Sequence, residues 1–346
     1  MKTKKLLSVM LSVLMLMTCL SPLTALAASE KKATVSGVKY TYTVNKGKAT
    51  ITGIEFNNYK KKSYTFPSKL GGKTVTEIKY RDKYVGVLGG YSITTVTIPK
   101  TVTKIATAPL MTNGTSVKKY SVAKGSKSFT ASSSVLFTKN KKTLVAYPAA
   151  KKDSSYTIPK TVKTVGSYAF YGNTKIKKVS FPKATATLGA YAFSECTKLK
   201  TVDMSKSKIK SIPKSCFFVL NLGTGSLTSV KFSSSTSTID SLAFSWQFSL
   251  KSITLPTSIK KVADQAFYQS GLTTVTVPKK VKSVSFGDGA FVTQYEGVTI
   301  VVKDKNTSIS CHKNSCVKAI KAPKNSKAAK YAKSHKKDGI KYKELK

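Results

Sequence analysis

Cysteine and histidine come together in one short segment, Cys311-His312-Lys313-Asn314-Ser315-Cys316. Thiolate and imidazole groups are common zinc ligands, but three local ligands fall short of the four that a structural zinc site takes. Lys313 and Lys318 also oppose a bound cation, so we expect no metal here. The two cysteines are close enough in sequence to close a small loop, and we predict a disulfide between Cys311 and Cys316.

Other residues capable of catalysis are few and dispersed. The chain holds two histidines and 14 acidic residues, and the acidic residues occur singly, so no carboxylate pair suits glycoside hydrolysis. No Gly-x-Ser-x-Gly segment is present, and the Gly-x-Gly segments at 223–225 and 287–289 lack the flanks of a phosphate-binding loop. We therefore expect a protein that is not an enzyme and that uses no cofactor.

Positive charge dominates the composition. Lysine and arginine number 60 against 14 acidic residues, the formal net charge is +46, and Arg81 is the only arginine. Lysine attracts phosphate and sulfate as a point charge but lacks the planar fork with which arginine reads base edges. This composition favours affinity for anionic polymers without specific readout of nucleic acid. A codon bias toward lysine is the alternative explanation.

The first 27 residues have the pattern of a signal peptide. Lysines precede the apolar run 6–20, and Ala25-Leu26-Ala27 places small residues where signal peptidase cleaves. Lipoprotein processing at Cys19 is the alternative. No later segment has the ~20 consecutive apolar residues that span a bilayer. We expect a chain with no transmembrane segment after cleavage that is either secreted and extracellular or held at the cell wall without a covalent anchor.

The elements that position these side chains repeat along the chain. Six phenylalanines, five after alanine and one after Cys216, follow one another at intervals of 23 to 27 residues: Phe170, Phe193, Phe217, Phe244, Phe267 and Phe291. Units of this length bury their apolar faces only by stacking on their neighbours, which predicts a solenoid. Cys196 and Cys216 fall at different positions of adjacent repeats, so we expect two buried free thiols.

Each repeat has the same internal order. Alternating apolar residues such as Val275 and Val277 predict a strand with one buried face. Proline usually follows and ends the pairing, because it has no N–H to donate. A second apolar pair, such as Val281 and Val284, predicts a return strand or extended segment, and Ala-Phe predicts a corner. We expect a mainly β solenoid with short helical or irregular corners.

This order resembles a known class of repeats. Leu-x-x-Val-x-Ile-Pro, then Val-x-x-Val-Gly, then Ala-Phe, as across 157–170 and 272–291, resembles the BspA-like class of bacterial leucine-rich repeats. The resemblance covers roughly residues 93–302 and recurs at least six times. It implies a secreted or surface-exposed interaction protein that acts in adhesion to host or neighbouring cells, and it names no ligand.

The segments outside the main repeats agree with this resemblance. Residues 40–56 resemble the hairpin that opens such domains, 134–148 their inserted hairpin, and 321–345 a closing cap of one short helix and one strand. We therefore divide the chain into a signal peptide (1–27), an N-terminal hairpin and capping region (28–92), a leucine-rich repeat solenoid (93–302) and a lysine-rich C-terminal cap (303–346).

The outward positions of the first strand form one candidate binding surface, the strand face. Stacked at about 4.8 Å per coil, they would make two columns rich in hydroxyl groups, suited to a protein or glycan. Serine and threonine also simply solvate an exposed strand, which is the alternative. The residues are Thr95, Thr97, Lys178, Ser180, Thr201, Asp203, Ser229, Lys231, Ser252, Thr254, Thr274 and Thr276.

Lysines just after the first strand and within the next extended pair form the second candidate surface. In a regular coil they would align as two neighbouring basic columns, and a bound polyanion would relieve the repulsion between them. Protection of exposed strand edges is the alternative. The residues are Lys100, Lys160, Lys163, Lys183, Lys206, Lys210, Lys260, Lys279 and Lys282.

Two binding functions follow from these surfaces. The first is adhesion to a host or bacterial surface protein or glycan through the strand face. The alternative is electrostatic binding of teichoic acid, acidic glycans or extracellular nucleic acid through the lysines. Steep weakening by salt would distinguish the second from the first, because lysine–phosphate contacts release counterions.

Overall fold

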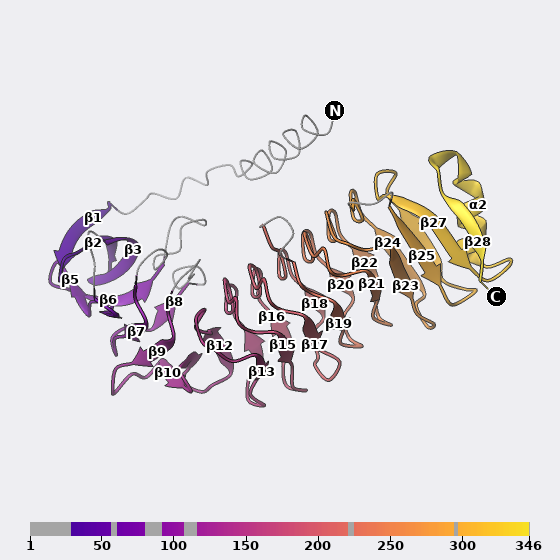
Figure 1. Cartoon of the computed structure of the whole chain (residues 1–346). Helices are drawn as coiled ribbons and strands as arrows, with labels where there is room; N and C mark the ends of the chain where they lie inside the picture. The colour runs from indigo at the N-terminus through magenta and orange to yellow at the C-terminus, as the bar shows by residue number, and fades with distance from the viewer. Residues whose placement is uncertain are drawn as a thin grey trace.

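The computed structural model describes residues 29–56, 61–79, 92–106, 116–220, 225–293 and 297–345. The predicted signal peptide, Cys19 and Arg81 lie outside these residues. The described chain forms a β-solenoid of about 11 turns with one short C-terminal helix, which confirms the predicted fold class. Figure 1 shows a curved array that runs from an N-terminal sheet to the helix.

The N-terminal sheet begins as an antiparallel meander and continues into parallel pairing. Two turns with glycine at positive φ, Gly37 and Gly47, connect its first three strands. The third strand then pairs in parallel with β6, which pairs in parallel with β8 and so joins the sheet to the solenoid. The strands are β1 (Lys31–Val35), β2 (Val38–Asn45), β3 (Lys48–Phe56), β5 (Lys69–Leu70), β6 (Lys73–Ile78) and β8 (Lys104–Ile105).

The first strands of successive coils pair in parallel and form three sheets. Their alternate side chains are buried, as at Val96, Val179 and Val275, each 0% exposed, so the opposite side chains must face outward. The sheets consist of β4 (Ser63–Thr65), β7 (Thr95–Ile98) and β9 (Lys119–Val122); β13 (Ser155–Thr157), β15 (Lys178–Ser180), β17 (Thr201–Asp203) and β19 (Ser229–Lys231); and β21 (Ser252–Thr254), β23 (Thr274–Val277), β25 (Val298–Val302), β27 (Val317–Ala322) and β28 (Lys341–Glu344).

The return strands are shorter and form two further sheets. One of them is followed by Gly189, which close packing requires, since a Cβ there would collide with the backbone of Ser167. An antiparallel insertion, β10 to β12, starts the first of these sheets. The sheets are β10 (Phe129–Ser132), β11 (Val135–Thr138), β12 (Thr143–Ala146), β14 (Thr164–Val165) and β16 (Thr187–Leu188); and β18 (Ser211–Ile212), β20 (Thr238–Ile239), β22 (Lys261–Val262), β24 (Ser283–Phe286) and β26 (Ser308–Cys311).

The Ala-Phe corners are turns that stack from coil to coil. The six phenylalanines are at most 1% exposed, and neighbouring rings stack with centroids 4.5 to 5.7 Å apart. The turn backbones also hydrogen-bond to each other, as when the Phe170 N–H donates to the Ala192 carbonyl at 2.7 Å. Full burial of one phenylalanine stabilises by about 1.5–3 kcal/mol, so this column is a main support of the fold.

A helix and a strand close the last coil. Helix α2 (Lys327–Ser334) begins at Ser326, whose Oγ accepts a hydrogen bond from the Ala329 N–H at 3.1 Å. Its alanines are buried against the solenoid while Lys327, Lys330 and Lys333 are exposed, and β28 pairs with β27. This arrangement covers the apolar end of the array, as repeat proteins require. Within the described chain, no helix combines the length and apolar character needed to cross a membrane.

Candidate functional site

The strand-face residues are aligned in two columns within each first-strand sheet. Parallel pairing places equivalent residues of successive coils directly beside each other. The valines between them along each strand are buried, so the residues of the two columns face outward. The register partners are Lys178, Thr201 and Ser229, and Ser180, Asp203 and Lys231, in the central sheet; Ser252 with Thr274, and Thr254 with Thr276, in the C-terminal sheet; and Ser63 with Thr95, and Thr65 with Thr97, in the N-terminal sheet.

The strand face is divided, because pairing of the first strands stops between β19 and β21. A hollow of about 590 Å³ opens there, lined on one side by Lys231 and on the other by Thr254. Val230, next to the break, is only partly buried, unlike the equivalent Val202. The strand face is therefore a set of shorter platforms instead of one continuous surface.

Three of the predicted basic residues meet at one place, the lysine hollow. Lys160, Lys183 and Lys206 follow Pro159, Pro182 and Ser205, which succeed the first strands of adjacent coils. With Lys208, which was not predicted from the sequence, they line a hollow of about 670 Å³. All four lysines are exposed.

The strand face borders the same hollow. Thr157, Ser180 and Asp203, one from each of three adjacent coils, line it beside the lysines, and Phe181 and Pro182 add apolar surface. The hollow therefore offers positive charge, hydroxyl groups and an apolar wall within three coils. Thr157 was not predicted, although it is the register partner of Ser180 and its place before Ile158-Pro159 is the sequence signal that identifies it.

Asp203 is the carboxylate that lines the lysine hollow. Partial burial opposes its ionisation, but its Oδ1 accepts hydrogen bonds from the backbone N–H of Ser205 (3.0 Å) and from its Oγ (2.6 Å). These bonds, with the charges of Lys231 and Lys206, hold the pKa of Asp203 below its ordinary value. Asp203 is therefore ionised at neutral pH and offsets part of the lysine charge.

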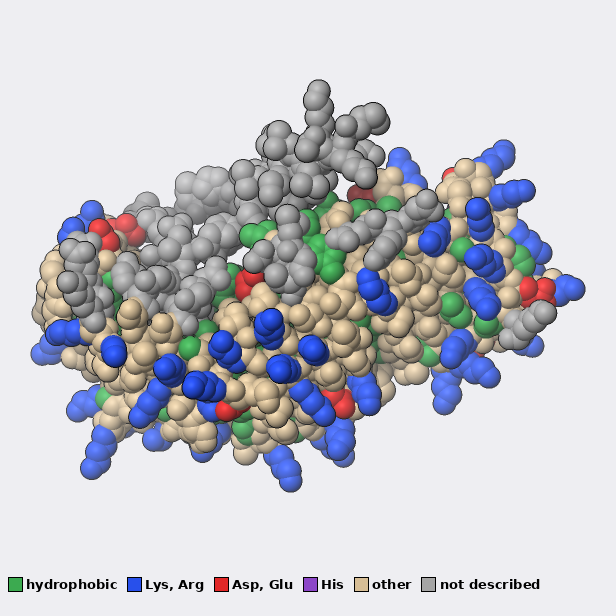
Figure 2. Space-filling view, in the orientation of Figure 1, with side chains coloured by type: hydrophobic (Ala, Val, Ile, Leu, Met, Phe, Trp, Pro, Cys, Tyr) green, Lys and Arg blue, Asp and Glu red, His purple; other side chains and the backbone are tan. Residues whose placement is uncertain are grey.

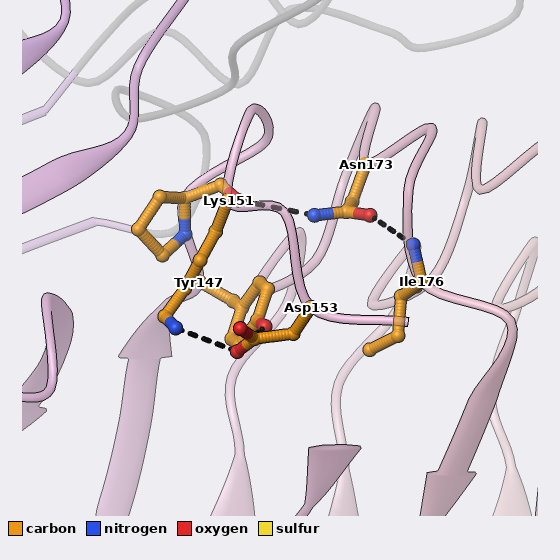
Figure 3. Close-up of polar contacts among 6 residues, drawn as sticks. Tyr147, Lys151, Asp153, Asn173 and Ile176 are labelled. Atoms are coloured by element: carbon orange, nitrogen blue, oxygen red, sulfur yellow. Dashed lines mark hydrogen bonds and ion pairs between the residues drawn. The ribbon is translucent and has the colours of Figure 1, made fainter. Parts of the chain in front are cut away.

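A partly buried set of polar contacts fixes the segment that leads into β13 (Figure 3). Tyr147 Oη donates to Asp153 Oδ2 at 2.7 Å, and Lys151 Nζ lies 2.6 Å from the same oxygen. The hydrogen bond from Lys151 is the main cause that lowers the pKa of Asp153. Asn173 Nδ2 donates to the Pro148 carbonyl at 3.0 Å, and Asn173 Oδ1 accepts from the Ile176 N–H at 2.8 Å. These contacts set the start of the sheet that carries the hollow.

The remaining predicted lysines are not brought together. Lys163, Lys210 and Lys260 lie at equivalent places, but Ala186 and Ser237 occupy the coils between them, and Lys282 follows in the coil of β24. The predicted second basic column is therefore interrupted, because alternate coils have uncharged residues there.

The first basic column also extends over fewer coils than its spacing suggested. Ser234 and Thr257 take the lysine position in the two coils after Lys206. Beyond them, the charge of Lys279 helps to lower the pKa of Asp304. Lys100 belongs to the separate N-terminal first-strand sheet, where it follows β7. Among the predicted lysines, Lys160, Lys183 and Lys206 are the three that occupy this position in successive coils of one first-strand sheet.

Cys311 and Cys316 are free thiols in the structure, so the expected disulfide is not formed there. Cys311 ends strand β26, and burial raises its thiol pKa to about 11. Cys316 is exposed, and its Sγ lies 3.4 Å from the Asn314 carbonyl oxygen, to which it donates. Cys196 and Cys216 are both buried and are not bonded to another cysteine in the structure.

His312 lies beside a carboxylate instead of contributing to a ligand set. Its Nδ1 lies 3.2 Å from Asp288 Oδ1, and both side chains are about half exposed. Across the residues that the structure describes, no group of three or more His, Cys, Asp or Glu side chains is arranged to hold a metal ion.

Comparison with known proteins identifies the class of this solenoid as a leucine-rich repeat. The family model described as "BspA type Leucine rich repeat region (6 copies)" matches residues 146–225 and 221–335. The two matches together cover more than half of the chain, and the chain belongs to this family. No curated protein matches the sequence.

The chain is similar to solved structures from several bacteria. The pneumococcal vaccine antigen PcpA is 17% identical, with a TM-score of 0.52 over 92% of this chain and 100% of that chain. A leucine-rich repeat protein from Eubacterium ventriosum is 23% identical over 78% of this chain and 96% of that one, with a TM-score of 0.46. A leucine rich cell surface protein from Faecalibacterium prausnitzii is 17% identical over 74% and 91%, with a TM-score of 0.34. At this level of identity, the likeness to PcpA shows the fold alone.

Proposed function

We propose that this chain is an exported bacterial surface protein that adheres to anionic polymers of cell surfaces through the lysine hollow. The signal-peptide pattern supports export, and the similarity in fold to a pneumococcal vaccine antigen agrees with a surface location. The observation that carries the proposal is the convergence of four exposed lysines with strand-face hydroxyls at one hollow.

The chemistry of the hollow fits a polymer with regularly spaced phosphate or sulfate groups. Lys160, Lys183 and Lys206 come from adjacent coils, whose strands repeat at about 4.8 Å. Like charges this close repel each other, and a bound polyanion removes that cost while releasing its own counterions. The hydroxyls of Thr157 and Ser180 supply hydrogen bonds beside the charges. Phosphate polymers of the wall, acidic glycans and extracellular nucleic acid share this chemistry.

The experiment compares dextran sulfate with neutral dextran as probes for the mature chain. The variant K160S/K183S/K206S is expected to lose about tenfold or more in affinity at 0.1 M salt. It should also reduce the steepness of log affinity against log salt by about 2. Each lysine contact that forms in the parent releases slightly less than one counterion, and the variant lacks three such contacts. The matched control, K39S/K48S/K69S, removes three exposed lysines from the N-terminal sheet. Equal losses in both variants would show that only the overall charge matters.

Adhesion to a protein or neutral glycan through the strand face is the second candidate function. The registered hydroxyl columns and the hollow between β19 and β21 favour it. Such binding would persist at high salt, because hydroxyl contacts release no counterions. The doubly substituted variant T254K/T276K would block the strand face while leaving the lysine hollow unchanged, and it should abolish salt-resistant binding to cells.

A further inference from the structure

The stacked turns have a charge opposite to that of the rest of the surface. The turn segments 166–172, 189–195, 213–220, 240–248, 263–271 and 287–293 contain four of the 14 carboxylates, at Glu195, Asp240, Asp264 and Asp288. They contain one of the 60 basic residues, Lys214. Lys214 is exposed, so the turn geometry accepts lysine, and packing does not explain its scarcity elsewhere.

The outward residues of these turns are also rich in aromatic and apolar side chains. We call the surface that these outward residues form the turn stripe. Tyr168 and Tyr191 stack with centroids 4.8 Å apart and an interplanar angle of 1°. Trp246 contacts the rings of Phe248 (5.8 Å) and Tyr268 (6.3 Å) edge to face. These tyrosines and Phe248 are half-buried. Among the described residues, Leu220 is one of only two exposed large hydrophobic residues, at 55% exposure.

The turn stripe follows the inner edge of the curved array. In Figure 1 the turns lie along the upper, concave side, between the N-terminal sheet and the C-terminal cap. Figure 2 shows hydrophobic side chains gathered at the upper middle of the molecule, whereas lysines are spread over the front and lower surfaces. Solenoids commonly use such an extended concave surface for binding.

The backbone beneath the stripe is ordered before any partner arrives. Hydrogen bonds connect successive turns, as from the Phe193 N–H to the Cys216 carbonyl (2.8 Å) and from the Trp246 N–H to the Tyr268 carbonyl (2.8 Å). The stacked phenylalanines fill the space below. Residues held in this way lose little conformational entropy on binding, which favours affinity.

We propose that the turn stripe is a docking surface for a protein partner whose contact patch combines apolar side chains with arginine or lysine. Enrichment in tyrosine, tryptophan and phenylalanine together with depletion of lysine is the composition of protein-interface cores. Charge complementarity with Glu195, Asp264 and Asp288 selects basic side chains at the edges of that patch. The same carboxylates repel the anionic polymers assigned to the lysine hollow, so the two surfaces bind different classes of ligand.

A cationic partner must approach a chain with a formal charge of +46, but screening limits this repulsion. Exposed charges more than about 8 Å apart interact weakly at physiological ionic strength. The local carboxylates and the aromatic rings therefore decide the contact. Lysine over an aromatic ring already occurs within this chain, where Lys333 Nζ lies 5.2 Å from the centroid of the Tyr342 ring.

The test uses the mature chain and a displayed library of random peptides, selected in 0.15 M salt. Enriched peptides are expected to combine apolar residues with arginine or lysine. Their affinity should fall about tenfold or more in the apolar variant L220S/F248S, the loss expected for one interface anchor. The charge variant E195Q/D264N/D288N should weaken binding about three- to tenfold, mainly in the association rate. It keeps the side-chain acceptors that bond the Leu220 and Asp288 N–H groups.

Two controls keep the test decisive. L220S alone changes an exposed side chain, so it should retain the thermal midpoint of the parent and still weaken the peptides severalfold. The variant K160S/K183S/K206S should bind the peptides at least as tightly as the parent. The proposal fails if no peptide distinguishes the parent from L220S/F248S, if the enriched peptides are acidic, or if neutral oligosaccharides bind through Leu220 and Phe248 where peptides do not. None of these results depends on the binding of dextran sulfate, so the proposed function is tested independently of the turn stripe.

Discussion

The lysine hollow and the turn stripe lie on different sides of the same coils and differ in nearly every surface property. The hollow has four exposed lysines and Asp203, whereas the stripe has aromatic rings, carboxylates and Leu220. A codon bias toward lysine would act on both sides alike. The scarcity of lysine in the turns therefore argues that bias alone does not set the surface charge, and that the two sides are adapted to different partners.

Both surfaces depend on the same interior, and removing part of it should have the largest effect. Phe244→Ala deletes a ring that is 0% exposed and stacked between Phe217 and Phe267. We expect a loss of about 3–5 kcal/mol in the free energy of unfolding, since a buried cavity remains. Denaturation by urea followed by circular dichroism measures it.

The control for this substitution is Ser249→Ala, an exposed position directly after the same turn. It should change the stability by less than about 0.5 kcal/mol. If Phe244→Ala matched this control, the stacked phenylalanines would not be the support shared by the two surfaces.

Thiol reactivity measures how rigid the turn side is. In the fully reduced protein, exposed Cys316 should react with a thiol reagent at least ~100-fold faster than Cys216, because a buried, protonated thiol reacts only after opening. Burial raises the pKa of the Cys216 thiol well above its ordinary value. Time-resolved mass spectrometry of labelled peptides gives both rates. Comparable rates would mean that the turns open readily and present no preorganised stripe.

Introducing lysine into the turn stripe separates the two surfaces directly. Gln265→Lys places a positive charge at a half-exposed turn position beside Asp264. Binding of the selected basic peptides should weaken about fivefold through like-charge repulsion, while dextran sulfate affinity should be nearly unchanged. Gln265→Ser is the matched control and should retain most of the peptide affinity. A gain in peptide affinity on adding lysine would reverse the proposed polarity of the stripe.

The fold could be predicted because its determinants recur in most coils. Val275, Pro278 and Phe291 have equivalents at fixed spacing, and each type of residue has one physical role in strand, strand end or corner. The alignment of the strand face followed from the same regularity. Interruptions could not be predicted in this way. Nothing local to Val230 indicates that β19 and β21 separate, since that depends on how whole coils stack.

The sites were less predictable than the fold because they combine residues from different positions of several coils. Lys208 lines the lysine hollow although it lies outside the repeat position shared by Lys160 and Lys183. The sequence does contain a signal for the turn stripe, because carboxylates cluster in the turns, where lysine is nearly absent. The net charge of the whole chain conceals this difference. Counting charges separately for each repeat position would have found it.

Asp203 should produce the smallest effect on this comparison, because it is one partly exposed charge among four lysines. Asp203→Asn removes the negative charge from the lysine hollow, and we expect dextran sulfate affinity to rise about two- to threefold at 0.1 M salt and pH 7, as is usual for one exposed charge pair. Peptide binding at the turn stripe should not change. Isothermal titration calorimetry measures both affinities.

The pH dependence supplies the internal check on Asp203. Its pKa is held below the ordinary value, so the stability contributed by the ionised form is present above the unfolded-state pKa and is lost as pH falls through the lower folded-state pKa. Only in that acidic range does the parent lose the Asp203 charge, while sulfate groups stay ionised. The affinity difference between the parent and Asp203→Asn should therefore persist from pH 7 down to about pH 4, near the ordinary carboxyl pKa, and disappear only at lower pH. A difference that disappeared already near pH 6 would show that another group, and not Asp203, controls the charge of the lysine hollow.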